Sequence, residues 1–296
     1  MDVWAGTGRF LPDIFKIKEE IFMVIQHNIA AINSYRNLGT NQSALNKNLE
    51  KLSSGYKINR AGDNAAGLAI SESMRSQING LNQAAANAND AIGLIQTAEG
   101  ALTEVHSMLQ RMKTLTTQAA NGTYTATARG NIKAEIDALS AEITRIASTT
   151  EFNGEKPLAP ANKGANLTFF IGASPATANA MTVAQQAMTQ TALKINTISV
   201  KTTTLAFAAM KSVEAAIETV SSYRATLGAA QNRLEHTVNN LKVTAENITS
   251  AESRIRDTDM ADEITAYTKN NILLQAAQSM LSQSNAMPQG VLSMLQ

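Results

Sequence analysis

The sequence predicts a mainly α-helical protein, built as an elongated antiparallel helical bundle or coiled coil with short β-hairpins in the middle of the chain. In two long segments apolar residues recur every seven positions, which places them along one seam of a helix. The seam residues are Met74, Leu81, Ala88, Ile95, Leu102 and Leu109 in one segment and Val213, Val220, Leu227, Leu234, Leu241, Ile248 and Ile255 in the other. The second seam implies a helix longer than about 60 Å, which needs an equally long partner. The first segment supplies that partner.

A third, shorter helix is predicted after a loop at 121–130. Its apolar residues step by three and four positions, and they are Ile132, Ile136, Leu139, Ile143 and Ile146. Three such stripes can bury one another without a compact centre. Further along the chain, turn-forming residues at 151–154 and 164–175 alternate with β-prone residues at 167–171 and 181–183. This alternation predicts one or two short hairpins.

Both ends of the chain predict further amphipathic helices, over 24–56 and 264–296. Asp63 is the expected N-cap of the long helix that follows, and Pro288 with Gly290 is expected to weaken or kink the last helix. Each end carries an apolar stripe with little nearby to cover it, which is typical of an assembly subunit. The candidate assembly residues are Ile25, Ile29, Ile32, Leu38, Ile272, Leu273, Met280, Leu281, Val291 and Leu292.

Composition excludes several functions. The net charge of +1 gives no basis for binding nucleic acid. The absence of cysteine excludes disulfides, iron–sulfur clusters and thiol catalysis. No apolar run reaches the roughly 18 residues of a membrane span, so we expect no membrane insertion, and we expect no cleavable secretion signal.

The ionisable residues show no catalytic or metal-binding pattern. His27, His106 and His236 are scattered, and none has a metal-ligand spacing. The chain has neither a nucleophile elbow nor a phosphate-binding glycine loop. We therefore expect no catalytic residues, no cofactor and no metal.

Seven separated blocks resemble bacterial flagellins, in the family's order and over essentially all of residues 23–296. The blocks lie at 28–31, 49–55, 63–69, 151–154, 227–240, 253–257 and 275–292. The resemblance implies that 23–62 and 256–296 are the two halves of an inner terminal-helix domain. It also implies that 63–255 is a rod-like coiled-coil domain with hairpins around 150–200.

The family's outer variable domains are expected to be absent, because the chain between 153 and 203 is short. A thin, smooth filament follows from this. Residues 1–22 have no counterpart in the family pattern, which begins at Met23. Because 18–22 can be encoded by a purine-rich ribosome-binding sequence just before the Met23 codon, we expect translation to start at Met23.

The resemblance implies a structural subunit that polymerises helically into the flagellar propeller for motility. Its implied partners are copies of itself, cap and junction proteins, and an export chaperone that docks on 264–296. Export would follow the flagellar type III route and deliver the chain to the filament outside the cell. A hook–filament junction protein is the alternative, although the blocks at 234–237 and 288–292 favour filament flagellin.

The segment 110–118 resembles the flagellin segment sensed by a Toll-like receptor of animal hosts. Arg111, Leu115 and Gln118 match that segment, and Glu135 aligns with a further contact. Thr114 stands where the family commonly has an acidic residue, which removes one charge-assisted contact. Subunit packing is the other explanation for this face. Because of the match to the receptor-sensed segment, a secreted ligand selected for immune signalling is a third candidate function.

Overall fold

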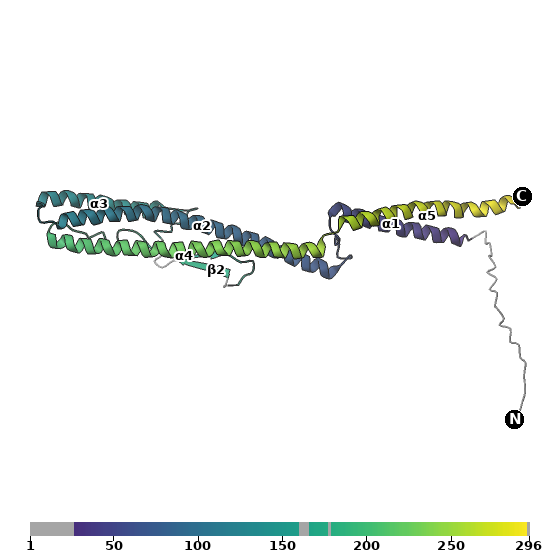
Figure 1. Ribbon diagram of the computed structural model, residues 1–296, viewed down its shortest axis with the longest axis horizontal. Helices are drawn as coiled ribbons and strands as arrows, with labels where there is room; N and C mark the ends of the chain where they lie inside the picture. The colour runs from purple at the N-terminus through teal and green to yellow at the C-terminus, as the bar shows by residue number, and fades with distance from the viewer. Residues whose placement is uncertain (1–26, 160–165, 177–178, 295–296) are drawn as a thin grey trace, which may run out of the picture. The chain divides into compact units, whose positions relative to one another are not determined.

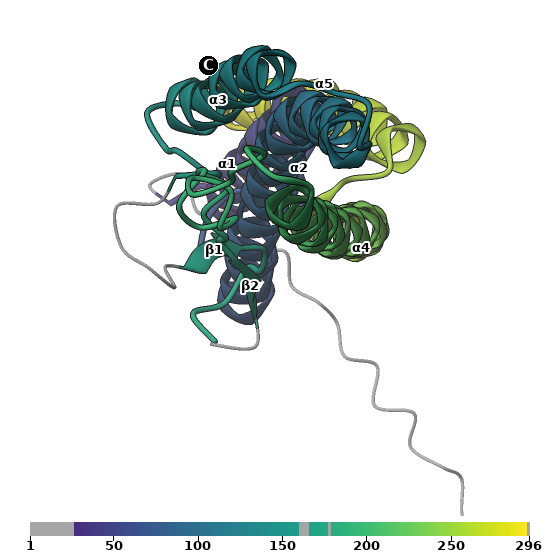
Figure 2. The ribbon, with the colours of Figure 1, turned by 90° about the vertical axis from the view of Figure 1, so that its left-hand side faces the viewer.

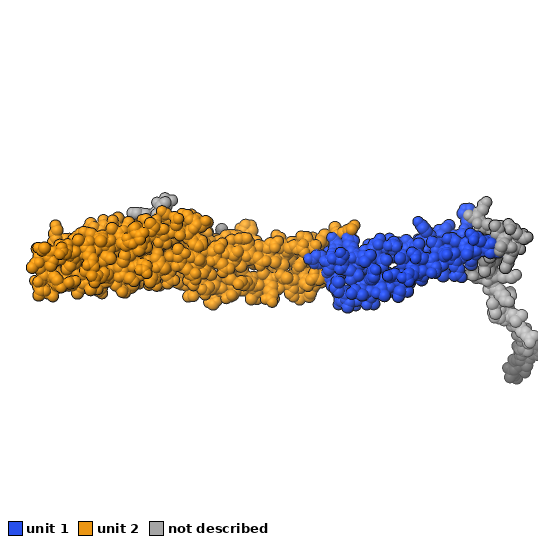
Figure 3. Space-filling view, turned by 90° about the horizontal axis from the view of Figure 1, so that it is seen from above, with its two compact units in different colours: residues 1–59, 258–296 blue, residues 60–257 orange. Residues whose placement is uncertain are grey.

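The computed structural model describes residues 27–159, 166–176 and 179–294, with side chains described up to residue 290. Within these residues the chain forms five helices and one two-stranded sheet. They divide into two compact units, coloured separately in Figure 3: unit 1 combines the chain up to Asn59 with the chain from Thr258, and unit 2 is Arg60–Asp257. The extension predicted at 1–22 lies outside the described residues, as does Ile25.

Unit 2 is built on two long helices, α2 (Ala65–Ala120) and α4 (Thr203–Arg256), which lie side by side in Figure 1. The ion pairs between them show that they run antiparallel, because the residue numbers rise along α2 as they fall along α4. The pairs are Glu72–Arg256, Glu99–Arg224 and Lys113–Glu214. The shorter helix α3 (Ala126–Thr149) packs on the end of α2.

The predicted seams form the core of unit 2. The seam residues from Leu81 to Leu109 and from Val213 to Leu241 are all buried, whereas Met74, Ile248 and Ile255 at the ends are half-buried. This confirms the mainly α-helical bundle predicted from the sequence. The core also takes residues from irregular segments on either side of the hairpin: Leu158, Met188, Ile195 and Val200 are at most 1% exposed.

The starts of two helices differ from the prediction. Asn64, not Asp63, caps α2: its Oδ1 accepts a hydrogen bond from the Gly67 amide at 2.9 Å. The Asp63 carboxylate accepts instead from the Arg60 amide at 3.1 Å. The loop predicted at 121–130 ends earlier, because the Thr125 hydroxyl accepts from the Ala128 amide at 3.3 Å and starts α3 at Ala126.

One hairpin forms in the middle of the chain, from β1 (Asn166–Phe170) and β2 (Ala180–Ala184). Figure 2, which looks along the helices, shows it lying outside α2, α3 and α4. Asn87 on α2 holds it there by donating to the Phe170 carbonyl at 3.1 Å. The turn at 152–155 is closed by one isolated bridge, with Asn153 and Gly154 both at positive φ, which favours the tight two-residue turn seen there.

Unit 1 consists of two helices, α1 (Ile29–Ser54) and α5 (Met260–Met294), which pack on each other. Gly55 ends α1 at φ 75°, a left-handed conformation that glycine adopts without strain. Asp259 starts α5 before the predicted residue 264, because its Oδ1 accepts from the Ala261 amide at 2.8 Å. In the described part of the chain no helix combines the length and apolar character needed to cross a membrane.

Helix α5 continues through Pro288 to Met294, so Pro288 does not end the helix. Proline removes the amide that would bond the carbonyl four residues earlier. That carbonyl belongs to Ser284, and it accepts a hydrogen bond from the Asn28 side chain at 2.7 Å instead. A contact from the other end of the chain therefore replaces the missing helix bond.

Candidate assembly and recognition surfaces

Unit 1 leaves large apolar side chains exposed on both of its helices. On α1 the exposed fractions are 66% for Ile29 and 52% for Ile32, and on α5 they are 61% for Ile272, 40% for Leu273 and 60% for Met280. A monomer rarely exposes so many large apolar groups without a binding partner. These five side chains form what we call the unit 1 apolar surface.

Other predicted assembly residues are less exposed or not described. Leu38 and Leu281 are half-buried. Val291 and Leu292 lie within α5, but their side chains are outside the described residues, as is the whole of Ile25.

Among the exposed large apolar residues of the same helices that the sequence prediction did not include, Tyr35 and Met287 are the two most exposed. Tyr35 on α1 is 70% exposed and Met287 on α5 is 55% exposed. Helical spacing could have found both, since Tyr35 follows Ile32 by three residues and Met287 follows Met280 by seven. They extend the unit 1 apolar surface along each helix.

Three polar contacts join α1 to α5. Asn28 donates to the Ser284 carbonyl at 2.7 Å, Asn41 Nδ2 lies 3.4 Å from the Leu273 carbonyl, and Lys51 Nζ lies 3.6 Å from Glu263 Oε2. Of the three, the Asn28 contact is the shortest, and the other two are near the limit of a useful interaction. The contact between Asn28 and Ser284, at the start of α1, is therefore the strongest of the three by distance.

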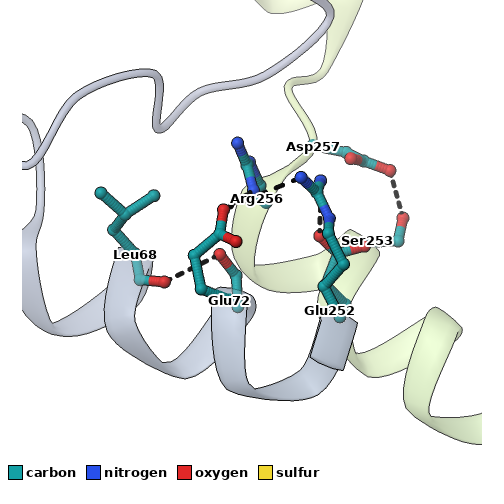
Figure 4. Close-up of polar contacts among 8 residues, drawn as sticks. Leu68, Glu72, Glu252, Ser253, Arg256 and Asp257 are labelled. Atoms are coloured by element: carbon teal, nitrogen blue, oxygen red, sulfur yellow. Dashed lines mark hydrogen bonds and ion pairs between the residues drawn. The ribbon is translucent and has the colours of Figure 1, made fainter. Parts of the chain in front are cut away.

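A cluster of ion pairs joins the beginning of α2 to the end of α4 (Figure 4). Arg256 Nη1 donates to Glu72 Oε1 at 2.7 Å. Arg75 lies between two carboxylates: its Nη1 is 3.7 Å from Glu72 Oε1, and its Nη2 is 3.4 Å from Glu252 Oε1. The side chains of Arg256 and Glu252 are only 12% and 13% exposed, whereas those of Glu72 and Arg75 are 52% and 39% exposed, so solvent screens part of this network as in a surface pair. It fixes the two helix ends to one another within unit 2.

The four residues of the receptor-like segment differ in accessibility. Arg111 and Glu135 form an ion pair of 2.8 Å that joins α2 to α3, and both side chains are about half exposed. Gln118 donates to the Tyr124 hydroxyl at 2.7 Å and lines an open groove of about 850 Å³ with Gln110 and Thr114.

Leu115 is 2% exposed and belongs to the core of unit 2. It shapes this face from inside rather than offering contact area. Of the four predicted residues, Arg111, Gln118 and Glu135 are therefore the three that are exposed on the folded unit.

The three histidines do not gather at one place: His27 precedes α1, His106 lies on α2 and His236 on α4. His106 contacts Gln110 through Nε2 at 2.9 Å. Among the described residues no three acidic, histidine or cysteine side chains are grouped closely enough to hold a metal ion.

A rigid helical bundle attached in sequence to a helix pair with an uncovered apolar surface defines a class of protein, the self-assembling structural subunit. Family models agree with this class. The bacterial flagellin N-terminal helical region matches residues 25–163, and the bacterial flagellin C-terminal helical region matches residues 210–295. The chain belongs to the bacterial flagellin family, and it is a structural subunit of the flagellar filament.

Relatives match nearly the whole chain. A flagellin of Bacillus subtilis is 50% identical, and the match covers 92% of this chain and all of the relative. The flagellar filament 33 kDa core protein of Treponema phagedenis is 44% identical over the same shares of the two chains. These matches confirm the resemblance, and the family consists of structural proteins that polymerise helically.

Two solved structures resemble this chain to different degrees. The crystal structure of Bacillus cereus flagellin is 32% identical, with a TM-score of 0.47 over 56% of this chain and 94% of that chain. A Vibrio parahaemolyticus protein described as flagellar hook-associated has a TM-score of 0.54 at 11% identity, over 66% of this chain and all of that chain. The second likeness concerns the fold alone.

Proposed function

We propose that this filament subunit polymerises through α1 and α5, whose unit 1 apolar surface packs against the same helices of neighbouring copies. The observation that carries the proposal is the exposure of five large apolar side chains on these two helices. Full burial of each is worth roughly 1.5–3 kcal/mol, so covering even part of this surface favours association strongly. The proposal assigns the chain no catalytic role.

Seeded polymerisation of the purified chain tests this proposal. The unaltered protein is expected to elongate filament seeds without any other protein, which a hook–filament junction protein would not do. Ile272→Asp is expected to stop elongation, because assembly would bury an unpaired carboxylate. Elongation is measured by sedimentation and electron microscopy.

Gln278→Asp is the matched control, since it adds the same charge at an exposed polar position of α5 that is not three or four residues from Ile272, Leu273 or Met280. It is expected to polymerise close to normally. Normal elongation of Ile272→Asp would refute the assembly role of this surface.

We further propose the domain division of the family for this chain: residues 23–62 with 256–296 as the inner terminal-helix domain, and 63–255 as the rod-like domain. In the described residues between α3 and α4, one hairpin is the only regular structure. This supports the absence of outer variable domains and a thin, smooth filament.

Export through the flagellar type III route is part of the proposal. A subunit with an uncovered apolar surface would associate prematurely inside the cell, so a cytosolic chaperone that covers α5 fits this chain. The segment 264–296 is the proposed docking site. Cap and junction proteins are the proposed partners at the ends of the filament.

A second proposed role is recognition of the monomer by a host Toll-like receptor through Arg111, Gln118 and Glu135. The Arg111–Glu135 pair supports it, because the pair joins two helices into one polar, half-exposed face. A receptor carboxylate could accept from the Arg111 guanidinium in a charge-assisted hydrogen bond.

Arg111→Ala is expected to lower receptor activation about tenfold, the effect of losing one hydrogen bond to a charged group. Motility is expected to persist, because an exposed ion pair adds little to stability. Receptor-reporter cells treated with monomer and a soft-agar motility assay measure the two effects.

Arg145→Ala is the control for this substitution. Arg145 forms an equally exposed ion pair with Glu142 on α3, where its hydrogen bond lowers the pKa of the Glu142 carboxyl. Loss of motility with unchanged receptor activation in Arg111→Ala would assign the face to subunit packing instead.

A further inference from the structure

The interior of the last helix contains one carbonyl that the regular pattern of helix hydrogen bonds leaves without a donor. Within an α-helix each carbonyl accepts from the amide four residues later. Pro288 has no amide hydrogen, so the Ser284 carbonyl loses its helix donor, and Pro288 is the one proline in α5. Ser284 is 7% exposed, so water has little access to it. A buried acceptor left without a donor costs about 1–3 kcal/mol.

Asn28 satisfies this carbonyl and uses both ends of its side chain to do so. Its Nδ2 donates to the Ser284 carbonyl at 2.7 Å, while its Oδ1 accepts from the Ala31 amide at 2.9 Å and caps α1. A side chain that accepts at one atom and donates at another is needed for both bonds at once. Aspartate could cap the helix as well, but its carboxylate has no hydrogen to donate to the Ser284 carbonyl.

We propose that Asn28 is a positioning residue for polymerisation, which fixes the register of α1 on α5 by replacing the hydrogen bond that Pro288 removes. The interior of α5 offers one such carbonyl, so slipping the pair by one turn, about 5.4 Å, would leave the carbonyl without a donor. A single buried asparagine likewise sets the register of a coiled coil, where a shift would leave its own polar side chain unpaired. The inference rests on the proposed assembly role of α1 and α5.

Asn41 provides a natural comparison on the same helix pair. Its Nδ2 also reaches an α5 carbonyl, that of Leu273, at 3.4 Å. Ala277 lies four residues after Leu273 within α5 and supplies the helix donor. The Asn41 bond is therefore an addition to a carbonyl already satisfied, whereas the Asn28 bond replaces a missing one.

The test measures the monomer concentration that remains in equilibrium with seeded filaments of the purified full chain. Asn28→Asp keeps the N-cap but removes the donor and faces a carbonyl with a carboxylate. It is expected to raise this concentration about tenfold, the effect of one unsatisfied buried acceptor. Asn41→Asp, the matched control, is expected to stay within about twofold of the unaltered chain.

Pro288→Ala supplies the decisive background, because alanine restores an amide that can bond the Ser284 carbonyl. In that background Asn28→Asp is expected to change the equilibrium monomer concentration by no more than about twofold. An equal penalty in both backgrounds would overturn the inference, and so would normal polymerisation of Asn28→Asp in the unaltered chain. Should Pro288→Ala itself not polymerise, an equal effect of Asn28→Asp and Asn41→Asp would overturn it.

Ile272→Asp in the same assay separates this inference from the assembly proposal. Blocked polymerisation of Ile272→Asp together with normal polymerisation of Asn28→Asp would reject the role of Asn28 and retain the assembly surface. Normal polymerisation of Ile272→Asp would reject the assembly surface, and with it the basis of the inference.

Discussion

Removal of residues 264–296 is expected to abolish polymerisation while leaving α2, α3 and α4 folded. The deletion removes nearly all of α5, including the exposed apolar residues Ile272, Leu273 and Met280 of the unit 1 apolar surface. Without α5, helix α1 also loses the surface on which it packs, and an isolated helix with a partly apolar face is marginal in water. Both halves of the proposed assembly surface are lost together.

Unit 2 is expected to survive this deletion because its core is self-contained. The buried cluster at its centre runs from Ala88 to Val238, and a second cluster takes its residues from Leu81 to Ala245. Neither cluster includes a residue of α5. Circular dichroism and thermal unfolding should show a folded helical protein with a transition close to that of the full chain.

Seeded polymerisation followed by electron microscopy measures the other half of this prediction. Filaments grown from the truncated chain would contradict the assembly role of α5. An unfolded unit 2 would contradict the independence of the two units.

Leu234→Ala is expected to lower the free energy of unfolding of unit 2 by about 3 kcal/mol. Leu234 is 0% exposed and lies on the α4 seam within the main core cluster. Replacing a buried leucine with alanine removes apolar contacts and leaves a cavity, at a cost of about 2–5 kcal/mol. In a long, thin bundle few side chains surround each seam position, so few neighbours can move to fill the cavity.

Leu205→Ala provides the same chemical change at a position on α4 that is 44% exposed. It is expected to lower the free energy of unfolding by less than about 1 kcal/mol, because much of the side chain is already in water. Urea unfolding followed by circular dichroism measures both variants. Equal destabilisation by the two substitutions would show that the seam is not the stabilising core of unit 2.

The three helices of unit 2 could be predicted because their seams depend on a short local period. A leucine or isoleucine every seven residues identifies a helix and its buried face without any knowledge of the partner. Helix starts were predicted less accurately. Asp63 and Asn64 are neighbours and both can cap a helix, and the Arg60 amide bonds Asp63, leaving Asn64 to cap α2.

For the receptor-like face, too, the sequence predicted some features correctly and missed others. Its spacing placed Arg111 and Glu135 on neighbouring helices, and the structure joins them in an ion pair. Periodicity along α2 did not reveal that Leu115 is buried, because α2 packs against α3 as well as α4 near its end. A helix with two partners has a wider buried face than one seam predicts.

The sequence by itself determined the helices and their seams, since each is read from residues close together in the chain, and it determined the flagellin family through seven short blocks in the family's order. Only the tertiary structure decided how Pro288 is accommodated and which irregular segments complete the core. Asn28 and Ser284 are 256 residues apart, and Met188 and Ile195 follow no helical or strand period. The physical reason is that any segment brought near by folding can donate the missing hydrogen bond or fill space in the core. A local sequence pattern does not specify which segment that is.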